Sequence, residues 1–80
     1  MSEVKFNKGC KEWMMFMDYW NLCQKYWITE ESDDYWNNFC NDTDKFCEKY
    51  KGILLARRLA LAIIEVKELE HLKLKEQRKE

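Results

Sequence analysis

Four cysteines and one histidine are the side chains in this sequence best suited to binding a metal or attacking a substrate. They are Cys10, Cys23, Cys40, Cys47 and His71. None of the cysteine spacings is C-x-x-C, so a zinc site would need all four thiols to converge from two helices. Cys–His catalysis would need His71, on the outer side of the last predicted helix, to fold back against one thiol. We therefore expect small core cysteines and no metal site.

The sequence also contains few of the residues that serine catalysis, phosphate binding or calcium binding requires. The two serines, Ser2 and Ser32, leave little material for a serine-based triad, and the two glycines, Gly9 and Gly52, form no phosphate-binding loop. The acids near the middle of the chain do not have the ligand spacing of a calcium loop. We therefore expect a protein that is not an enzyme and that carries no cofactor.

The length and composition favour one small helical domain, residues 1–80. The chain has no proline and two glycines, but four residues each of Trp, Tyr, Phe and Met. The scarcity of turn formers disfavours a sheet with tight hairpins, and a domain this small needs large side chains in its core. No apolar run has the length of a membrane span or a signal peptide. We expect a cytoplasmic protein with reduced thiols and no membrane contact.

Residues 32–50 form the clearest amphipathic helix, and the rest of the fold is arranged around it. Its apolar face comprises Tyr35, Trp36, Phe39, Cys40, Thr43, Phe46, Cys47 and Tyr50. Its polar face comprises Asn37, Asn38, Asn41, Asp42, Asp44, Lys45, Glu48 and Lys49. Ser32 suits the N-cap, with Thr29 as a rival, and acids at positions 33 and 34 suit the first turn.

Two further helices are predicted on either side of this one. The first runs from about Asn7 to Tyr26, and the third runs from about Ile53 to the middle of the 70s. Gly52 suits a left-handed residue after the second helix, and so short a connection predicts an antiparallel hairpin. The expected fold is an all-α three-helix bundle with the second helix between the others. Residues 1–6 and about 74–80 are expected to fray, and we find no internal repeat.

The apolar residues of the first and third helices form stripes that we expect to face the core. In the first helix the stripe comprises Phe6, Trp13, Phe16, Met17, Trp20, Cys23 and Trp27. In the third helix it comprises Leu55, Leu59, Ala62, Ile63, Val66 and Leu69. Further apolar side chains flank both stripes, more than a three-helix monomer easily covers. The first helix is therefore either central in the bundle or in contact with another chain, and the surplus predicts a homodimer or a surface kept for a partner.

Charge is distributed unevenly along the chain. Residues 1–27 carry four lysines and three acids (+1), residues 28–48 carry one lysine and seven acids (−6), and residues 49–80 carry nine basic and five acidic residues (+4). Phosphate neutralisation would need a stronger basic excess, so we expect no direct binding of nucleic acid. The acidic middle favours a basic protein surface as partner, and the alternative is an ordinary solvated helix face.

The candidate partner-binding residues are Glu30, Glu31, Asp42, Asp44 and Glu48. Asp33 and Asp34 have a weaker claim, because their place at a helix start already explains them. An alternative is a crevice for a small nucleotide at an oligomer interface. Its candidate residues are Tyr19, Tyr26, Arg57 and Arg58.

Four segments taken together carry a resemblance: QKYW (24–27), SDDYWNNF (32–39), FCEKY (46–50) and LALAII (59–64). In these segments the chain resembles small uncharacterised helical proteins that prophages and mobile elements of Gram-positive gut bacteria encode. The resemblance covers about residues 13–70, while the cysteines and the charged tail lie outside its pattern. It implies a phage context, in which small accessory proteins often bind and disable a host enzyme, including those of defence systems such as CRISPR.

These observations lead to one expected function and two alternatives. We expect a non-enzymatic inhibitor or adaptor of phage origin that binds a host protein, such as a defence effector, through an acidic helix face. The first alternative is an oligomeric protein that sequesters a small nucleotide signal. The second is a structural or regulatory phage subunit.

Overall fold

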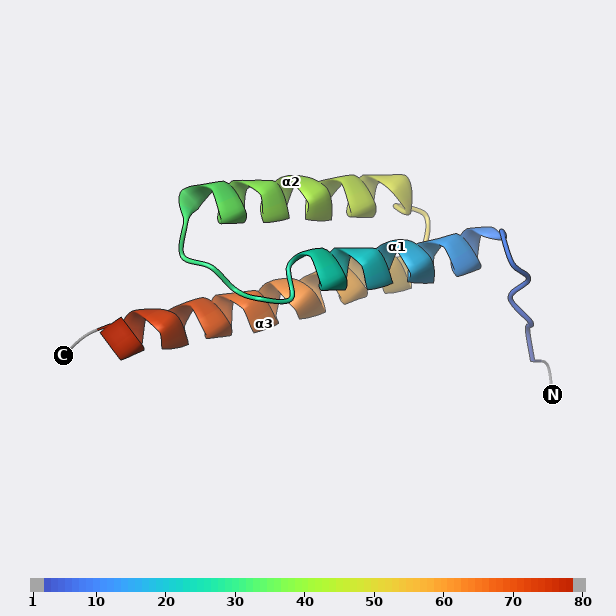
Figure 1. The fold of residues 1–80 in the computed structure, drawn as a ribbon. Coiled ribbons are helices and arrows are strands. Elements are labelled where there is room, and N and C mark those ends of the chain that lie inside the picture. Colours follow the sequence, from blue (N-terminus) through green and yellow to red (C-terminus); the bar gives the residue numbers. More distant parts are fainter. Residues whose placement is uncertain (1–2, 79–80) are drawn as a thin grey trace.

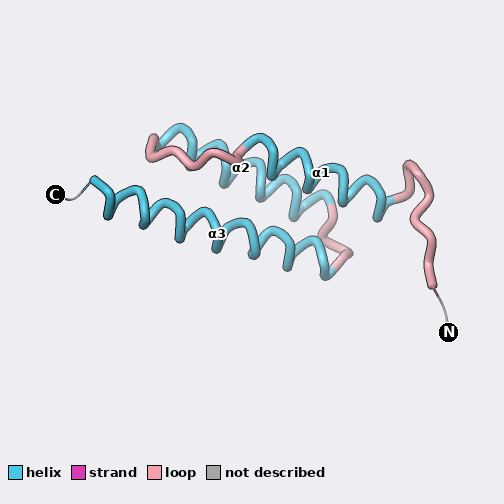
Figure 2. The backbone as a smooth tube through the Cα atoms, turned by 60° about the horizontal axis from the view of Figure 1, so that its bottom comes forward, coloured by secondary structure: helices cyan, strands magenta, loops and turns pink. Residues whose placement is uncertain are grey.

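Residues 3–78 form three helices, each of which packs against the other two (Figures 1 and 2). This computed structural model describes residues 3–78, in which α1 spans Lys11–Lys25, α2 spans Asp33–Lys49 and α3 spans Leu54–Arg78. The predicted all-α three-helix bundle is confirmed, and α2 runs antiparallel to both α1 and α3. Because α1 also contacts α3 directly, α2 does not separate them as the sequence predicts.

The helix starts follow from their capping residues. The Ser32 hydroxyl accepts a hydrogen bond from the backbone N–H of Tyr35 at 3.2 Å, so Ser32 is the N-cap of α2 and Thr29 is not. The first helix begins at Lys11, four residues later than predicted. Cys10 caps it through its sulfur, and Gly9, with φ of 92°, forms the turn that precedes it.

The turn after α2 and the end of α3 also differ from expectation. Gly52 does not adopt a positive φ. The turn is closed instead by a hydrogen bond from the Ile53 N–H to the Tyr50 carbonyl at 2.9 Å. The third helix continues to Arg78 and extends past the ends of α1 and α2 (Figures 1 and 2), whereas the sequence predicts fraying from about residue 74. Residues 1–2 and 79–80, which were also expected to fray, lie outside the described part of the chain.

Two hydrophobic clusters form the core. The first comprises Met15, Phe46, Tyr50, Ala56 and Ala60. The second comprises Leu22, Tyr26, Tyr35, Phe39 and Ile63. Each cluster takes residues from all three helices or their ends, and Tyr19 packs against both. None of the helices in residues 3–78 has the length and apolar character that a membrane crossing requires.

The tryptophan stripe of α1 does not face this core. Trp20 is 62% exposed and Trp27 is 73% exposed, while Met15 and Leu22 are buried in their place. The buried face is rotated about the helix axis from the predicted one, because the residues that contact α2 and α3 are Met15, Leu22 and Tyr26, which lie to one side of the predicted stripe. The prediction for this face of α1 is therefore wrong.

The predicted core stripe of α3 is correct only at Ile63, which is buried, and at Leu59, which packs against the first cluster. Leu55, Val66 and Leu69 are about half exposed, whereas Ala56 and Ala60 are buried. The small side chains of the alanines let α3 approach its neighbours closely, so the close contact forms there rather than along the leucine-rich stripe. Most residues of the two stripes that the sequence assigns to the core therefore lie on the outside of this chain, while Ile63, Leu59 and Cys23 contact the core.

Candidate functional site

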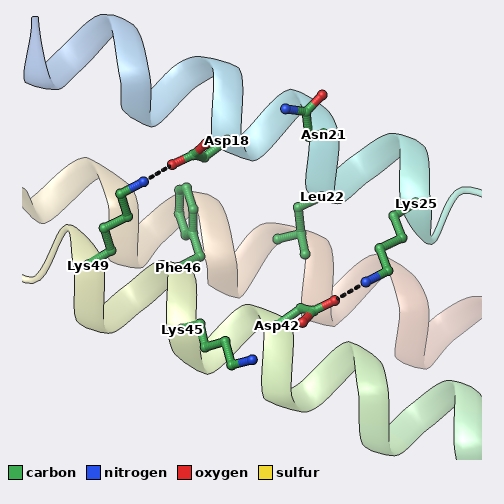
Figure 3. A pocket seen from close by; sticks show the side chains of 8 residues that line it. All are labelled: Asp18, Asn21, Leu22, Lys25, Asp42, Lys45, Phe46 and Lys49. Carbon is green, nitrogen blue, oxygen red and sulfur yellow. Dashed lines mark hydrogen bonds and ion pairs between the residues drawn. The ribbon is translucent and has the colours of Figure 1, made fainter.

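Asp42 lies in the seam between α1 and α2, not on the free polar face of α2 that the periodicity predicts. Its Oδ2 atom accepts a hydrogen bond from Lys25 Nζ at 2.7 Å (Figure 3). The same atom accepts one from the Tyr26 hydroxyl at 2.5 Å. The hydrogen bonds from Lys25 and Tyr26 hold the pKa of the Asp42 carboxyl below its usual value. Asp42 thus joins two helices of its own chain.

Asp18 makes the same kind of contact at the other end of the seam. Its Oδ2 atom accepts a hydrogen bond from Lys49 Nζ at 2.9 Å (Figure 3). The same atom accepts another from the Tyr50 hydroxyl. Partial burial raises the pKa of Asp18, but hydrogen bonds from Lys49 and Tyr50 outweigh burial, and the pKa lies below its usual value. We call these two contacts the Asp18 clamp and the Asp42 clamp.

The two clamps reveal an internal repeat, which corrects the prediction that there is none. Residues 18–26 and 42–50 share the pattern D-x6-K-Y, 24 residues apart. Because the helices are antiparallel, each aspartate binds the Lys–Tyr pair of the other copy. A shallow cavity of about 260 Å³ lies between the clamps (Figure 3). Its lining consists of four pairs with the same spacing: Asp18 and Asp42, Asn21 and Lys45, Leu22 and Phe46, Lys25 and Lys49.

Acid is expected to weaken this seam. The folded-state pKa values of Asp18 and Asp42 lie below the usual value, so the unfolded chain takes up protons first as pH falls. The stabilisation is complete above the unfolded pKa of about 4 and is lost as pH falls through the folded values. Urea unfolding at a series of pH values should therefore show a falling free energy of unfolding below about pH 5.

The matched control for the acid effect is the double variant Asp18→Asn, Asp42→Asn. It removes both carboxyls but retains side chains of the same shape that accept hydrogen bonds. We expect a lower free energy of unfolding at neutral pH and a shallower dependence on pH than in the unmodified chain. An unchanged pH dependence would show that other carboxyls control acid unfolding.

A buried lysine anchors the α1–α2 loop to α3, and the sequence analysis missed it. The Lys67 side chain is 3% exposed. Its ammonium donates hydrogen bonds to the Trp27 carbonyl at 2.9 Å, to Thr29 Oγ1 at 3.2 Å and to Glu70 Oε1 at 3.0 Å. The Thr29 hydroxyl in turn donates to Glu70 at 2.5 Å. The available sequence signal is that Lys67 follows Ile63 by one helical turn and so falls on the buried face.

His71 packs against α2. The sequence predicts instead that it lies on the outer side of α3. The Trp36 indole Nε1–H donates a hydrogen bond to His71 Nδ1 at 3.2 Å, and the two rings meet edge to face with centroids 4.9 Å apart. This pair fixes the C-terminal half of α3 against the start of α2.

The four cysteines are less buried than predicted. Cys10, Cys23 and Cys47 are half-buried, and Cys40 is exposed although its position falls on the predicted apolar face of α2. All four are free thiols, and residues 3–78 contain no group of three or more side chains placed to hold a metal ion. Cys23 lies beside Tyr19, where burial and then the neighbouring thiol raise the pKa of Tyr19 to about 12.

The remaining candidate acids lie apart from the seam. Glu30, Asp44 and Glu48 are exposed, while Glu31 is half-buried. Glu48 forms an exposed ion pair with Lys51 at 3.4 Å. Asp44 and Glu48 are one helical turn apart and line a cavity at the end of α2. We call Asp44 and Glu48 the α2 acidic pair.

The four candidate nucleotide-binding residues lie in different parts of the chain. Tyr26 is buried in the core, and its hydroxyl is engaged by Asp42. Tyr19 is half-buried where α1 meets α3, and Arg57 lies beside the α2 acidic pair. Arg58 is exposed on α3. Tyr26 is therefore not available for stacking on a base, and the prediction that it lines a nucleotide crevice is wrong for this residue.

A broad apolar surface lies where α1 and α3 run side by side. A groove of about 300 Å³ between them is lined by Tyr19, Cys23, Trp27, Ala62, Ile63, Val66, Lys67 and Glu70. Helical spacing places further exposed apolar side chains along its two edges. We define the α1–α3 face as Phe16, Trp20, Trp27, Leu55, Ala62, Val66 and Leu69. All of these belong to the stripes that the sequence analysis assigns to the core.

The geometry offers surfaces for binding and contacts that hold the helices together. The polar side chains of both clamps and of the Lys67 anchor are already engaged with one another. The α1–α3 face and the α2 acidic pair, by contrast, are exposed. Compared with protein-family models, with curated proteins and with solved structures, the chain matches none of them.

Proposed function

We propose that this protein is a non-enzymatic binding protein, an inhibitor or adaptor that acts by forming protein–protein interfaces. The observation that carries the proposal is the α1–α3 face, which places two exposed tryptophans and three large aliphatic side chains on one side of the bundle. Apolar patches of this extent on small proteins usually mark interaction sites, and exposed aromatic residues are enriched at the centres of interfaces.

The α2 acidic pair favours a basic target within this proposal, and a target would compete with Lys51, which is paired with Glu48, and with Arg57, which lines the same cavity. Asp44 and Glu48 lie on α2, which packs against the opposite side of α1 and α3 from the α1–α3 face. Exposed charges of one sign steer a partner of the other sign and reject partners of the same sign. Within this proposal, the resemblance to prophage proteins favours a host protein with a basic nucleic-acid-binding surface, such as a defence effector.

Reversing the charge of the α2 acidic pair is expected to weaken target binding. The double variant Asp44→Lys, Glu48→Lys should lower capture of a host protein from lysate by about tenfold, because two favourable charge contacts become repulsive. The circular dichroism spectrum should stay unchanged, because both positions are exposed. Quantitative affinity capture at two salt concentrations provides the measurement, and salt should weaken capture by the unmodified chain more than capture by the variant.

The matched control reverses two exposed acids elsewhere, at the far end of α3. Glu68→Lys, Glu76→Lys changes the net charge by the same amount, and capture should stay near that of the unmodified chain. A third variant, Val66→Glu, places a charge in the α1–α3 face and should also reduce capture. If neither the acidic-pair variant nor Val66→Glu differs from the control, the proposed binding function is wrong.

A further inference from the structure

The α1–α3 face approaches the size of one side of an ordinary protein–protein interface. Its six large side chains are between 40% and 73% exposed. At about 200 Å² for each large side chain, they leave roughly 650 Å² of apolar surface in water. The largest apolar patch on a typical monomer measures about 300–600 Å², and a standard interface buries about 800 Å² on each partner. The face therefore needs little more area to form a stable interface.

The spacing along α3 fits a second copy of the same helix. Leu55, Ala62 and Leu69 are seven residues apart, which places them along one line of the exposed surface. If two α3 helices cross antiparallel at Ala62, the small alanines allow a close approach at the centre. Leu55 of each copy then meets Leu69 of the other. A two-fold axis through this point makes the contact self-complementary, as a closed dimer requires.

Two exposed charges on α3 select the antiparallel direction. Arg58 lies four residues before Ala62, and Glu65 lies three residues after it, on the same edge of the stripe. In an antiparallel pair, Arg58 of each copy lies near Glu65 of the other. In a parallel pair the two-fold axis runs along the helices, so the edges that carry Arg58 and Glu65 lie on opposite sides of the contact and these opposite-charge contacts do not form. The charge pattern thus favours one of the two directions.

We propose that a second copy of this chain covers the α1–α3 face, with the two α3 helices antiparallel and the two-fold axis at Ala62. This dimer proposal rests on the proposed binding function, because the α1–α3 face is the observation that carries that function and the second copy is the partner that covers the face. Trp20 and Trp27 border the α3 contact on the α1 side and are shielded by the second copy. The α2 acidic pairs stay outside the contact, so the dimer presents two of them to a target.

Charge-swapped variants of the purified chain test both the dimer and its direction. The molar mass, measured by sedimentation over a range of concentrations, should be that of a dimer for the unmodified chain. Arg58→Glu and Glu65→Arg should each raise the dimer dissociation constant about tenfold, because each converts two attractive contacts into repulsive ones. The double variant Arg58→Glu, Glu65→Arg should recover the original value. An equimolar mixture of the two single variants should form a heterodimer.

A monomer at all concentrations would overturn the proposal. The proposal would also be overturned if the double variant dimerised with a dissociation constant no lower than that of either single variant. A parallel pair or an unrelated contact would give that result. Ala62→Glu, at the proposed two-fold axis, should give a monomer with unchanged helical content, whereas Asn41→Glu on α2 should stay dimeric. These measurements use no target protein. The dimer can therefore be absent while a target is still captured through the α2 acidic pair, and the dimer can form while no target is captured.

Discussion

Phe39→Ala should lower the free energy of unfolding by about 3–5 kcal/mol. Phe39 is 1% exposed, and its ring contacts those of Tyr26, Tyr35 and Trp36 with centroids 5.2, 6.5 and 5.8 Å apart. Truncation removes these contacts and leaves a cavity at the centre of the second core cluster. Since a single small domain has a total stability of only about 5–15 kcal/mol, this loss should lower the urea concentration at the unfolding midpoint substantially. Urea unfolding followed by circular dichroism measures the change.

The neighbouring variant Cys40→Ala is the matched control. Cys40 follows Phe39 on α2 but is exposed, although the sequence pattern predicts that both residues face the core. Surface substitutions usually change stability by less than about 0.5 kcal/mol, and we expect the same here. Similar losses for Phe39→Ala and Cys40→Ala would contradict the orientation of α2 in the bundle.

Lys67→Ala should lower the free energy of unfolding by about 2–3 kcal/mol. The ammonium is buried and bonded to the Trp27 carbonyl and the Thr29 hydroxyl, so its removal leaves loop acceptors without their donor. Because Glu70 is 45% exposed, water can take over part of its lost contact, and the cost stays below that of a fully buried pair. Hydrogen exchange should show faster opening at residues 26–32, and urea unfolding gives the total loss.

Two companion variants separate the contributions to this effect. Lys73→Ala removes an exposed lysine from the same helix and should change stability by less than about 0.5 kcal/mol. Lys67→Met keeps the apolar stem of the side chain and removes only the ammonium. We expect Lys67→Met to retain most of the loss seen in Lys67→Ala. If Lys67→Met is as stable as the unmodified chain, the hydrogen bonds to the loop contribute nothing to stability.

The second helix was predictable because local signals determine it. Ser32 as N-cap and the two acids after it define its start, and a single narrow apolar face defines its orientation. The core residues Phe39, Phe46 and Tyr50 are on that predicted face. A helix with one apolar side has one way to bury it, so periodicity was sufficient here.

The orientations of α1 and α3 were not predictable in the same way. Both helices are apolar over more than half of their circumference, and periodicity does not show which part faces inward. Large side chains at heptad spacing, such as Trp20 and Trp27, look like core but are exposed. Burial follows instead from how closely the backbones approach, and the small residues Ala56 and Ala60 determine this.

The candidate site was predictable only in part, because its contacts join residues far apart in the sequence. Asp44 and Glu48 are exposed as their helical positions indicate. Asp42 has the same polar character, but its role depends on the register of α2 against α1, which no local pattern gives. The contact between Trp36 and His71 spans 35 residues and depends equally on tertiary packing. The D-x6-K-Y repeat was visible in the sequence, and it was the one signal of the seam that could have been found there.

The two clamps also define how far α1 can slide along α2. A shift by one helical turn moves every side chain by about 5.4 Å, which exceeds the reach of a hydrogen bond. Because each helix carries both an aspartate and a Lys–Tyr pair, a shift in either direction separates Asp18 from Lys49 and Asp42 from Lys25 together. Misaligned hairpins therefore lose both ion pairs at once, so one alignment is favoured even between helices with interchangeable apolar side chains.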